Sequence, residues 1–159
     1  MRLYLLRHGK ALDKEHFEGA DADRPLSKKG QKRTREVFEQ LTEHKVKPEA
    51  ILTSPLKRAV ETAEIAKEIF KAPIEKVAAL AAGVKPGDAA AALASFSKEY
   101  DILMVVGHEP DLSRFAAWLS NQSTDDFGFK KAGCFCLAGK LKKGGMLLKW
   151  MLAPKDLDL

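Results

Sequence analysis

The chain has 159 residues, of which 45% are hydrophobic and 31% charged, and its formal net charge at pH 7 is +5. This length and composition predict one globular domain over residues 1–159 and exclude a disordered chain or a coiled coil. The apolar runs are far shorter than the roughly 18 residues of a membrane span, and no secretory signal is visible, so we expect a cytoplasmic protein without a membrane partner.

The first predicted strand is Arg2–Leu6, because a short aliphatic run ends close to a glycine. Arg7, His8 and Gly9 follow it directly. In α/β sheets, ligands bind in the crevice outside the carboxyl ends of the strands. The polar, acidic stretch from Leu12 to Arg24 predicts a long loop, and loops of that length usually have a function.

The rest of the chain alternates between helical and strand patterns. The predicted helices run from a Ser27 cap to about His44, from a Ser54 cap with Pro55 at the first helical position to about Phe70, from Pro86 to Glu99, and over Asp111–Leu119. The further predicted strands are Ala50–Thr53, Ile74–Leu80, Ile102–Val106, Cys134–Ala138 and Met146–Leu152, the last two joined as a hairpin across Lys140–Gly145. This alternation predicts an α/β fold with a mostly parallel central sheet and helices on both faces, in three α/β/α layers.

Four side chains are expected to meet at one edge of this sheet. Arg7 and His8 follow the first strand, Arg58 lies in the first turn of the helix after the second, and His108 follows the strand Ile102–Val106. The carboxyl ends of parallel strands share one edge, so these residues should converge there. Arginine forks and a helix N-terminus both suit phosphate oxygens. The sequence therefore predicts a phosphate site.

Three motifs resemble the histidine phosphatase superfamily when taken in this order. They are Arg7-His8-Gly9, Ser54-Pro55 with Arg58, and Gly107-His108. The phrase Arg24-Pro25-Leu26-Ser27, the segment Gly107-His108-Glu109-Pro110 and the compact length are similar to the SixA-like phosphohistidine phosphatase branch. The resemblance extends from Leu3 to about Ala117.

The resemblance implies a phosphoglycerate mutase-like fold and a covalent mechanism. His8 would attack phosphorus as a neutral imidazole and form a phosphohistidine intermediate that water hydrolyses. Arg7, Arg58 and His108 would bind the phosphate oxygens, with no metal and no other cofactor.

One departure from the superfamily bears on the substrate. Many members carry a glutamate after the third strand that protonates an alkoxide leaving group, whereas Lys76–Lys85 contains no carboxylate. Alcohols leave poorly unless they are protonated, but phosphohistidine has a labile P–N bond and an imidazole leaving group. We therefore expect a phosphatase that acts on phosphohistidine in a protein, such as a histidine phosphotransfer domain. Asp88 and Glu109 stay open as proton donors.

Two other functions remain as alternatives. The first is a general phosphomonoesterase of the same superfamily that acts on small phosphorylated molecules. The second is a basic nucleic-acid-binding protein that uses Lys28–Arg35, but interleaved aromatic residues and a recognisable nucleic-acid module are absent, so no nucleic-acid partner is expected. The sequence has no HExxH motif and no glycine-rich nucleotide loop.

The remaining polar groups have simpler interpretations. The charge runs Lys28–Arg35 and Lys140–Lys143 are typical of a solvated helix face and a hairpin. His16 and His44 are expected in solvent, and Cys134 and Cys136 as small buried hydrophobic residues rather than a disulfide or a metal site.

Overall fold

A six-stranded mixed sheet forms the centre of the computed structural model, which describes residues 1–127 and 133–154. The strands are β1 (Arg2–Arg7), β2 (Ala50–Thr53), β3 (Ile74–Lys76), β4 (Ile102–Gly107), β5 (Cys134–Gly139) and β6 (Met146–Leu152). Their order is β3-β2-β4-β1-β5-β6. The first four pair in parallel, while β5 runs antiparallel to β1 and β6 antiparallel to β5. The predicted mostly parallel sheet and the final hairpin are confirmed.

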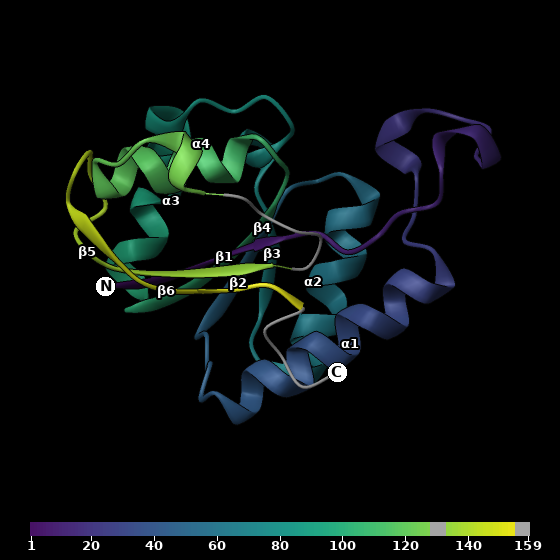
Figure 1. Cartoon of the computed structure of the whole chain (residues 1–159), viewed down its shortest axis with the longest axis horizontal. Coiled ribbons are helices and arrows are strands. Elements are labelled where there is room, and N and C mark those ends of the chain that lie inside the picture. The colour runs from purple at the N-terminus through teal and green to yellow at the C-terminus, as the bar shows by residue number, and fades with distance from the viewer. Residues whose placement is uncertain (128–132, 155–159) are drawn as a thin grey trace.

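Helices cover both faces of the sheet (Figure 1). Helices α1 (Lys28–Glu43) and α2 (Lys57–Phe70) pack on one face, and α3 (Pro86–Glu99) and α4 (Asp111–Ser120) on the other. Strand β1 shows why its aliphatic run is continuous: Leu3 and Leu5 join the core under α3 and α4, whereas Tyr4 and Leu6 join the core under α1 and α2. The predicted three-layer α/β/α architecture is confirmed.

Two predicted boundaries are wrong. Helix α2 begins at Lys57 with Leu56 as its N-cap, so Ser54 and Pro55 precede the helix. Strand β3 ends at Lys76 and a 3-10 turn, Ala78–Leu80, follows it. The reason is that the chain crosses the sheet edge here: Ile74 packs with the α1 and α2 side, whereas Leu80 is buried on the α3 side.

The predicted environments of the two cysteines and of two histidines agree with the structure. Cys134 and Cys136 are unbonded to each other and buried, and His16 and His44 are exposed. Within the described residues, no helix has both the length and the apolar character needed to cross a membrane.

Candidate active site

The carboxyl ends of β1 and β4 bring two histidines together. Arg7, the last residue of β1, lies opposite Gly107 of β4, and the backbone N–H of His8 donates to the Gly107 carbonyl (3.1 Å). The ring centroids of His8 and His108 are 5.2 Å apart. The charges of Arg7 and Arg58 act on both rings. The four residues expected at this edge are therefore neighbours.

His8 has one ring nitrogen fixed by the backbone. Its Nδ1 lies 2.7 Å from the carbonyl oxygen of Gly9. A carbonyl can only accept a hydrogen bond, so Nδ1 carries the proton and the lone pair is on Nε2. Burial, followed by the nearby His108 and the positive charges of Arg58 and Arg7, lowers the pKa of His8 to about 3. The ring is therefore neutral at physiological pH, as a nucleophile requires.

Gly9 connects this histidine to two helices. Its backbone N–H donates to Thr62 Oγ1 (3.1 Å), and the Thr62 hydroxyl donates to the Arg58 carbonyl (2.8 Å), so the loop after β1 is tied to the first turns of α2. A Cβ atom at Gly9 would collide with Thr34 Oγ1 of α1. Only glycine permits this close approach.

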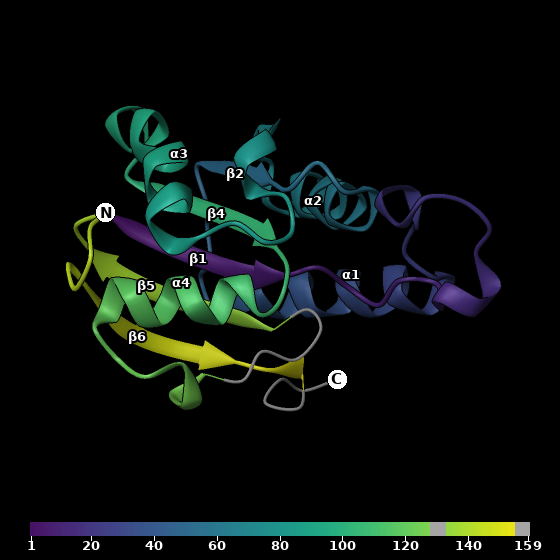
Figure 2. The same cartoon turned by 90° about the horizontal axis from the view of Figure 1, so that it is seen from above.

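Arg58 is held by the long loop between β1 and α1, which contains short 3-10 turns at Lys14–His16 and Asp21–Asp23. Its side chain is only 9% exposed. Nη1 donates to the main-chain oxygen of Asp21 (3.0 Å) and Nη2 to its Oδ2 (3.2 Å). Arg24 Nε donates to Asp21 Oδ1 (3.2 Å) from the other side. Figure 2 shows this loop extending beyond the ends of β1 and β4.

The two arginines lower the pKa of the Asp21 carboxyl. Burial alone would raise the pKa of Asp21, but the guanidinium groups of Arg58 and Arg24 hold that pKa below its usual value. Sequence analysis expected a functional loop without identifying Asp21. The only available signal was the acidic composition of the loop.

His108 is bound by Ser54, which was predicted to be a helix cap. His108 Nε2 lies 2.7 Å from Ser54 Oγ, and this oxygen also accepts the backbone N–H of Leu56 (3.2 Å). The serine therefore shapes the turn before α2 and orients the histidine. Burial first, and then the charge of Arg58, lower the pKa of His108 to about 4, although the Asp21 carboxylate acts in the opposite direction.

The other ring nitrogen of His108 differs from Nε2 in its hydrogen bonding. Its Nδ1 is buried and has no hydrogen-bond partner within residues 1–127 and 133–154. A buried polar atom without a partner costs free energy, and an oxygen of a bound anion would supply one.

The two candidate proton donors are placed differently. Glu109 accepts from the backbone N–H of Ser113 (2.8 Å) and from its hydroxyl (2.5 Å), so both carboxylate oxygens are used in the first turn of α4. Asp88 is exposed in the first turn of α3. Neither residue has a described hydrogen bond or ion pair with the two histidines or with Arg58.

A buried carboxylate that sequence analysis did not single out lies beside His108. Asp111 is 6% exposed, and its Oδ2 accepts the backbone N–H of Gly83 (2.7 Å). This hydrogen bond ties the segment Lys76–Lys85, which contains no carboxylate, to α4. Asp111 and His108 both line a small cavity of about 20 Å³.

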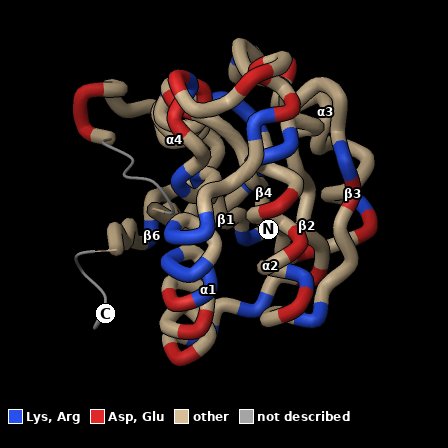
Figure 3. The backbone as a smooth tube through the Cα atoms, turned by 90° about the vertical axis from the view of Figure 1, so that its right-hand side faces the viewer, with Lys and Arg blue, Asp and Glu red and all other residues tan. Residues whose placement is uncertain are grey.

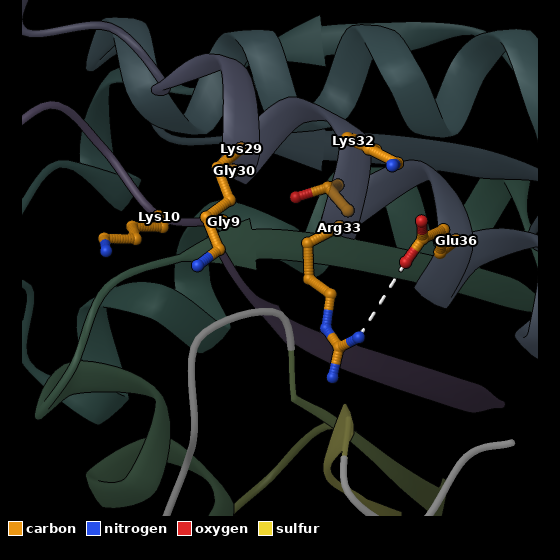
Figure 4. Close-up of a pocket in the computed structure, with 8 residues that line it drawn as sticks. Gly9, Lys10, Lys29, Gly30, Lys32, Arg33 and Glu36 are labelled. Atoms are coloured by element: carbon orange, nitrogen blue, oxygen red, sulfur yellow. Dashed lines mark ion pairs between the residues drawn. The ribbon is translucent and has the colours of Figure 1, made fainter. Parts of the chain in front are cut away.

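A basic groove with a volume of about 520 Å³ lies beside Gly9 and Lys10, the residues that follow His8. It is lined by Gly9, Lys10, Lys29, Gly30, Lys32, Arg33, Thr34 and Glu36. The predicted solvated face, Lys28–Arg35, is indeed exposed over most of its length, but part of it forms one wall of this groove (Figure 4).

In the part of the chain that the structure describes, no set of three or more His, Cys, Asp or Glu side chains is arranged to hold a metal ion.

The sequence of this chain is similar to a known family and to a protein of a cyanobacterial strain. The model of the histidine phosphatase superfamily (branch 1) matches residues 3–82. An uncharacterized protein of Picosynechococcus sp. is 36% identical over 139 residues, which span 84% of this chain and 82% of that protein.

Solved structures share the fold. The protein histidine phosphatase SixA complexed with tungstate superimposes with a TM-score of 0.87 at 24% identity, covering 98% of this chain and 99% of that chain. The alpha-ribazole phosphatase of Shigella flexneri gives 0.75 at 16% identity, with 97% of each chain covered. A mycobacterial glucosyl-3-phosphoglycerate phosphatase gives 0.73 at 18% identity, covering 96% of this chain and 99% of that chain.

Proposed function

This chain belongs to the histidine phosphatase superfamily and is a phosphatase; we propose that it removes phosphate from phosphohistidine on a protein, with His8 as the nucleophile. The observation that carries the proposal is the state of His8. Its Nδ1 proton is engaged by the Gly9 carbonyl, its Nε2 keeps the lone pair, and its pKa of about 3 keeps the ring neutral.

The first step transfers the phosphoryl group. His8 Nε2 attacks phosphorus in line, the P–N bond of the substrate breaks, and its electron pair stays on the departing imidazole. That imidazole leaves as a neutral group when its other nitrogen carries a proton, so the enzyme need not supply one. The new N–P bond makes the His8 ring cationic, and the Gly9 carbonyl, 2.7 Å from Nδ1, stabilises it.

The second step restores the enzyme. Water attacks the phosphorus bound to His8, inorganic phosphate leaves, and His8 returns to its neutral form. Arg7, Arg58 and His108 would bind the equatorial oxygens in both steps, where electrostatic stabilisation provides most of the catalysis. The buried Nδ1 of His108 supports this role because an anion would complete its hydrogen bonding. The scheme invokes no metal.

The carboxylates near the site support phosphohistidine as the substrate. Lys76–Lys85 contains none. The oxygens of Glu109 bind Ser113, Asp111 binds the backbone of Gly83, and Asp88 is exposed. A phosphate ester needs an acid to protonate its leaving oxygen, and a general acid typically contributes about 10²- to 10⁴-fold in rate. A phosphohistidine substrate avoids this requirement.

The test compares leaving groups directly. We expect kcat/KM for a phosphohistidine protein to exceed that for a phosphoserine peptide by at least about 100-fold, since the missing acid penalises only the ester. EDTA should leave both rates unchanged. A ratio near one would instead favour the alternative, a phosphomonoesterase for small molecules.

The nucleophile is tested separately with labelled substrate. Radioactive phosphate from a phosphohistidine substrate should appear on the wild-type enzyme as an acid-labile adduct. His8→Ala should lose both the adduct and turnover while keeping its circular dichroism spectrum. An adduct that persists in His8→Ala would assign the nucleophile to another residue.

A further inference from the structure

The basic groove beside His8 is built by close packing of two backbones. A Cβ at Gly30 would collide with the Lys10 carbonyl, just as one at Gly9 would collide with Thr34. The Lys10 carbonyl also accepts the backbone N–H of Ser27 (3.0 Å). These contacts hold the start of α1 against the residues that follow the nucleophile, so the α1 side chains border the active site.

The groove has a strongly positive lining. Four of its side chains are cationic and one is anionic, which gives a formal charge of +3 (four minus one): Lys10, Lys29, Lys32 and Arg33 against Glu36. Figure 3 shows the Lys and Arg positions in the turns of α1 nearest β1. Arg33 approaches Glu36 at 3.8 Å, and no ion pair to the three lysines is found among the described residues. A concave surface lined by charges of one sign attracts and concentrates ligands of the opposite charge.

The position and length of the groove fit a polypeptide. Its α1 wall runs from Lys29 to Glu36, about two turns or roughly 10 Å, which corresponds to about three residues of an extended chain. Because His8 is only 9% exposed, a protein substrate must insert its phosphorylated side chain into the site, while the residues that flank this side chain stay outside. Gly9 lines the groove and adjoins His8, so the flanking residues of the substrate would lie over the groove.

We propose that this groove docks acidic side chains that flank the phosphohistidine of the partner protein. The proposal rests on the proposed function and narrows its substrate to phosphoproteins with carboxylates beside the phosphorylated histidine. Nucleic acid fits less well, because the described lining has no aromatic side chain for base stacking and Glu36 would repel a phosphate backbone.

The experiment uses two phosphohistidine peptides that differ only in three flanking positions, glutamate in one and glutamine in the other. The wild-type enzyme should show a KM about tenfold lower for the glutamate peptide, with similar kcat, and added salt should reduce the difference. The triple variant Lys29→Ala, Lys32→Ala, Arg33→Ala should treat the two peptides alike. Absence of a preference in the wild type, or its survival in this variant, would overturn the proposal.

A matched control removes the same charge elsewhere. Lys47, Lys67 and Lys98 are exposed and lie outside the groove, and their combined change to alanine should preserve the preference. If this control also abolished it, net charge rather than the groove would be responsible. Lys32→Ala alone should give an intermediate preference, which guards against misfolding of the triple variant.

A binding measurement without phosphoryl transfer tests docking in the groove independently of hydrolysis. Fluorescence anisotropy should detect the unphosphorylated glutamate peptide on the wild type and on the control, and at least about tenfold weaker binding on the groove variant. Equal binding to all three proteins would overturn the docking proposal even if phosphohistidine is hydrolysed. Binding that is lost in the groove variant would support docking even if the peptides resist hydrolysis. Tighter, groove-dependent binding of a single-stranded RNA of equal charge would reassign the surface to nucleic acid.

Discussion

The two buried histidines should make the folded chain sensitive to acid. Burial first, and then neighbouring charges, lower the pKa of His8 to about 3 and that of His108 to about 4, whereas an unfolded chain binds these protons near pH 6.5. Below pH 6.5 the unfolded state therefore holds more protons than the folded state. The free energy of unfolding falls as the pH drops through this window, and the loss from each histidine ends only at its folded pKa.

The size of the effect follows from these values. At pH 5 both folded rings are still neutral, and pH 5 lies about 1.5 pH units below the unfolded pKa. At about 1.36 kcal/mol per unit, each histidine costs about 2 kcal/mol relative to pH 8, or about 4 kcal/mol together. Domains are stable by only about 5–15 kcal/mol, so the loss is a large fraction of the total.

Urea unfolding followed by tryptophan fluorescence at pH 8, 6.5 and 5 measures this loss. His8→Gln cannot titrate and should lose about 2 kcal/mol less than the wild type between pH 8 and pH 5. His44→Gln, at an exposed position, is the matched control and should follow the wild type. Tungstate, the anion in the SixA complex, should reduce the acid loss in the wild type, because a bound anion favours the protonated rings. Parallel acid curves for His8→Gln and the wild type would refute the assignment of a buried, neutral His8.

Two further predictions concern the loop and the guanidinium that it holds. Arg58→Lys keeps the charge but loses the two-pronged geometry of the guanidinium, so kcat/KM should fall by about one to three orders of magnitude and tungstate should inhibit more weakly. Unchanged kinetics would mean that Arg58 does not bind the phosphate. Asp21→Asn keeps the main-chain oxygen that accepts from Arg58 Nη1 and removes the half-exposed carboxylate charge that pairs with both Arg58 and Arg24, so steady-state kinetics should show a smaller loss, about tenfold or less. A loss as large as that of Arg58→Lys would show that the carboxylate acts by more than positioning.

Most of the fold could be predicted because each strand is a local pattern. The apolar run before Arg7 and the β-branched run before Gly107 mark buried strands, and the rule that parallel strands share a carboxyl edge then brings His8 and His108 together. The exact end of β3 could not be predicted, since it depends on the chain crossing the sheet edge to bury Leu80.

The parts of the site that sequence analysis missed depend on contacts between distant segments. Ser54 has the ordinary signature of a helix cap, but its hydroxyl binds His108, 54 residues away. Asp21 begins a short 3-10 turn in the long loop, and only the folded chain places its carboxylate on Arg58. A short polar side chain can bind either a nearby backbone group or a distant side chain, so spacing alone does not reveal which partner it binds.

In the proposed mechanism, stability and catalysis depend on the same contacts at His8. Burial and the neighbouring arginines disfavour its protonated form, and this costs stability whenever the surrounding pH favours protonation. The same environment keeps the Nε2 lone pair available down to about pH 3, well below the pH at which a solvated histidine is protonated. Replacing His8 should therefore make the protein more resistant to acid while removing the proposed nucleophile. The two changes should be inseparable at this position because a single neutral, buried ring causes both.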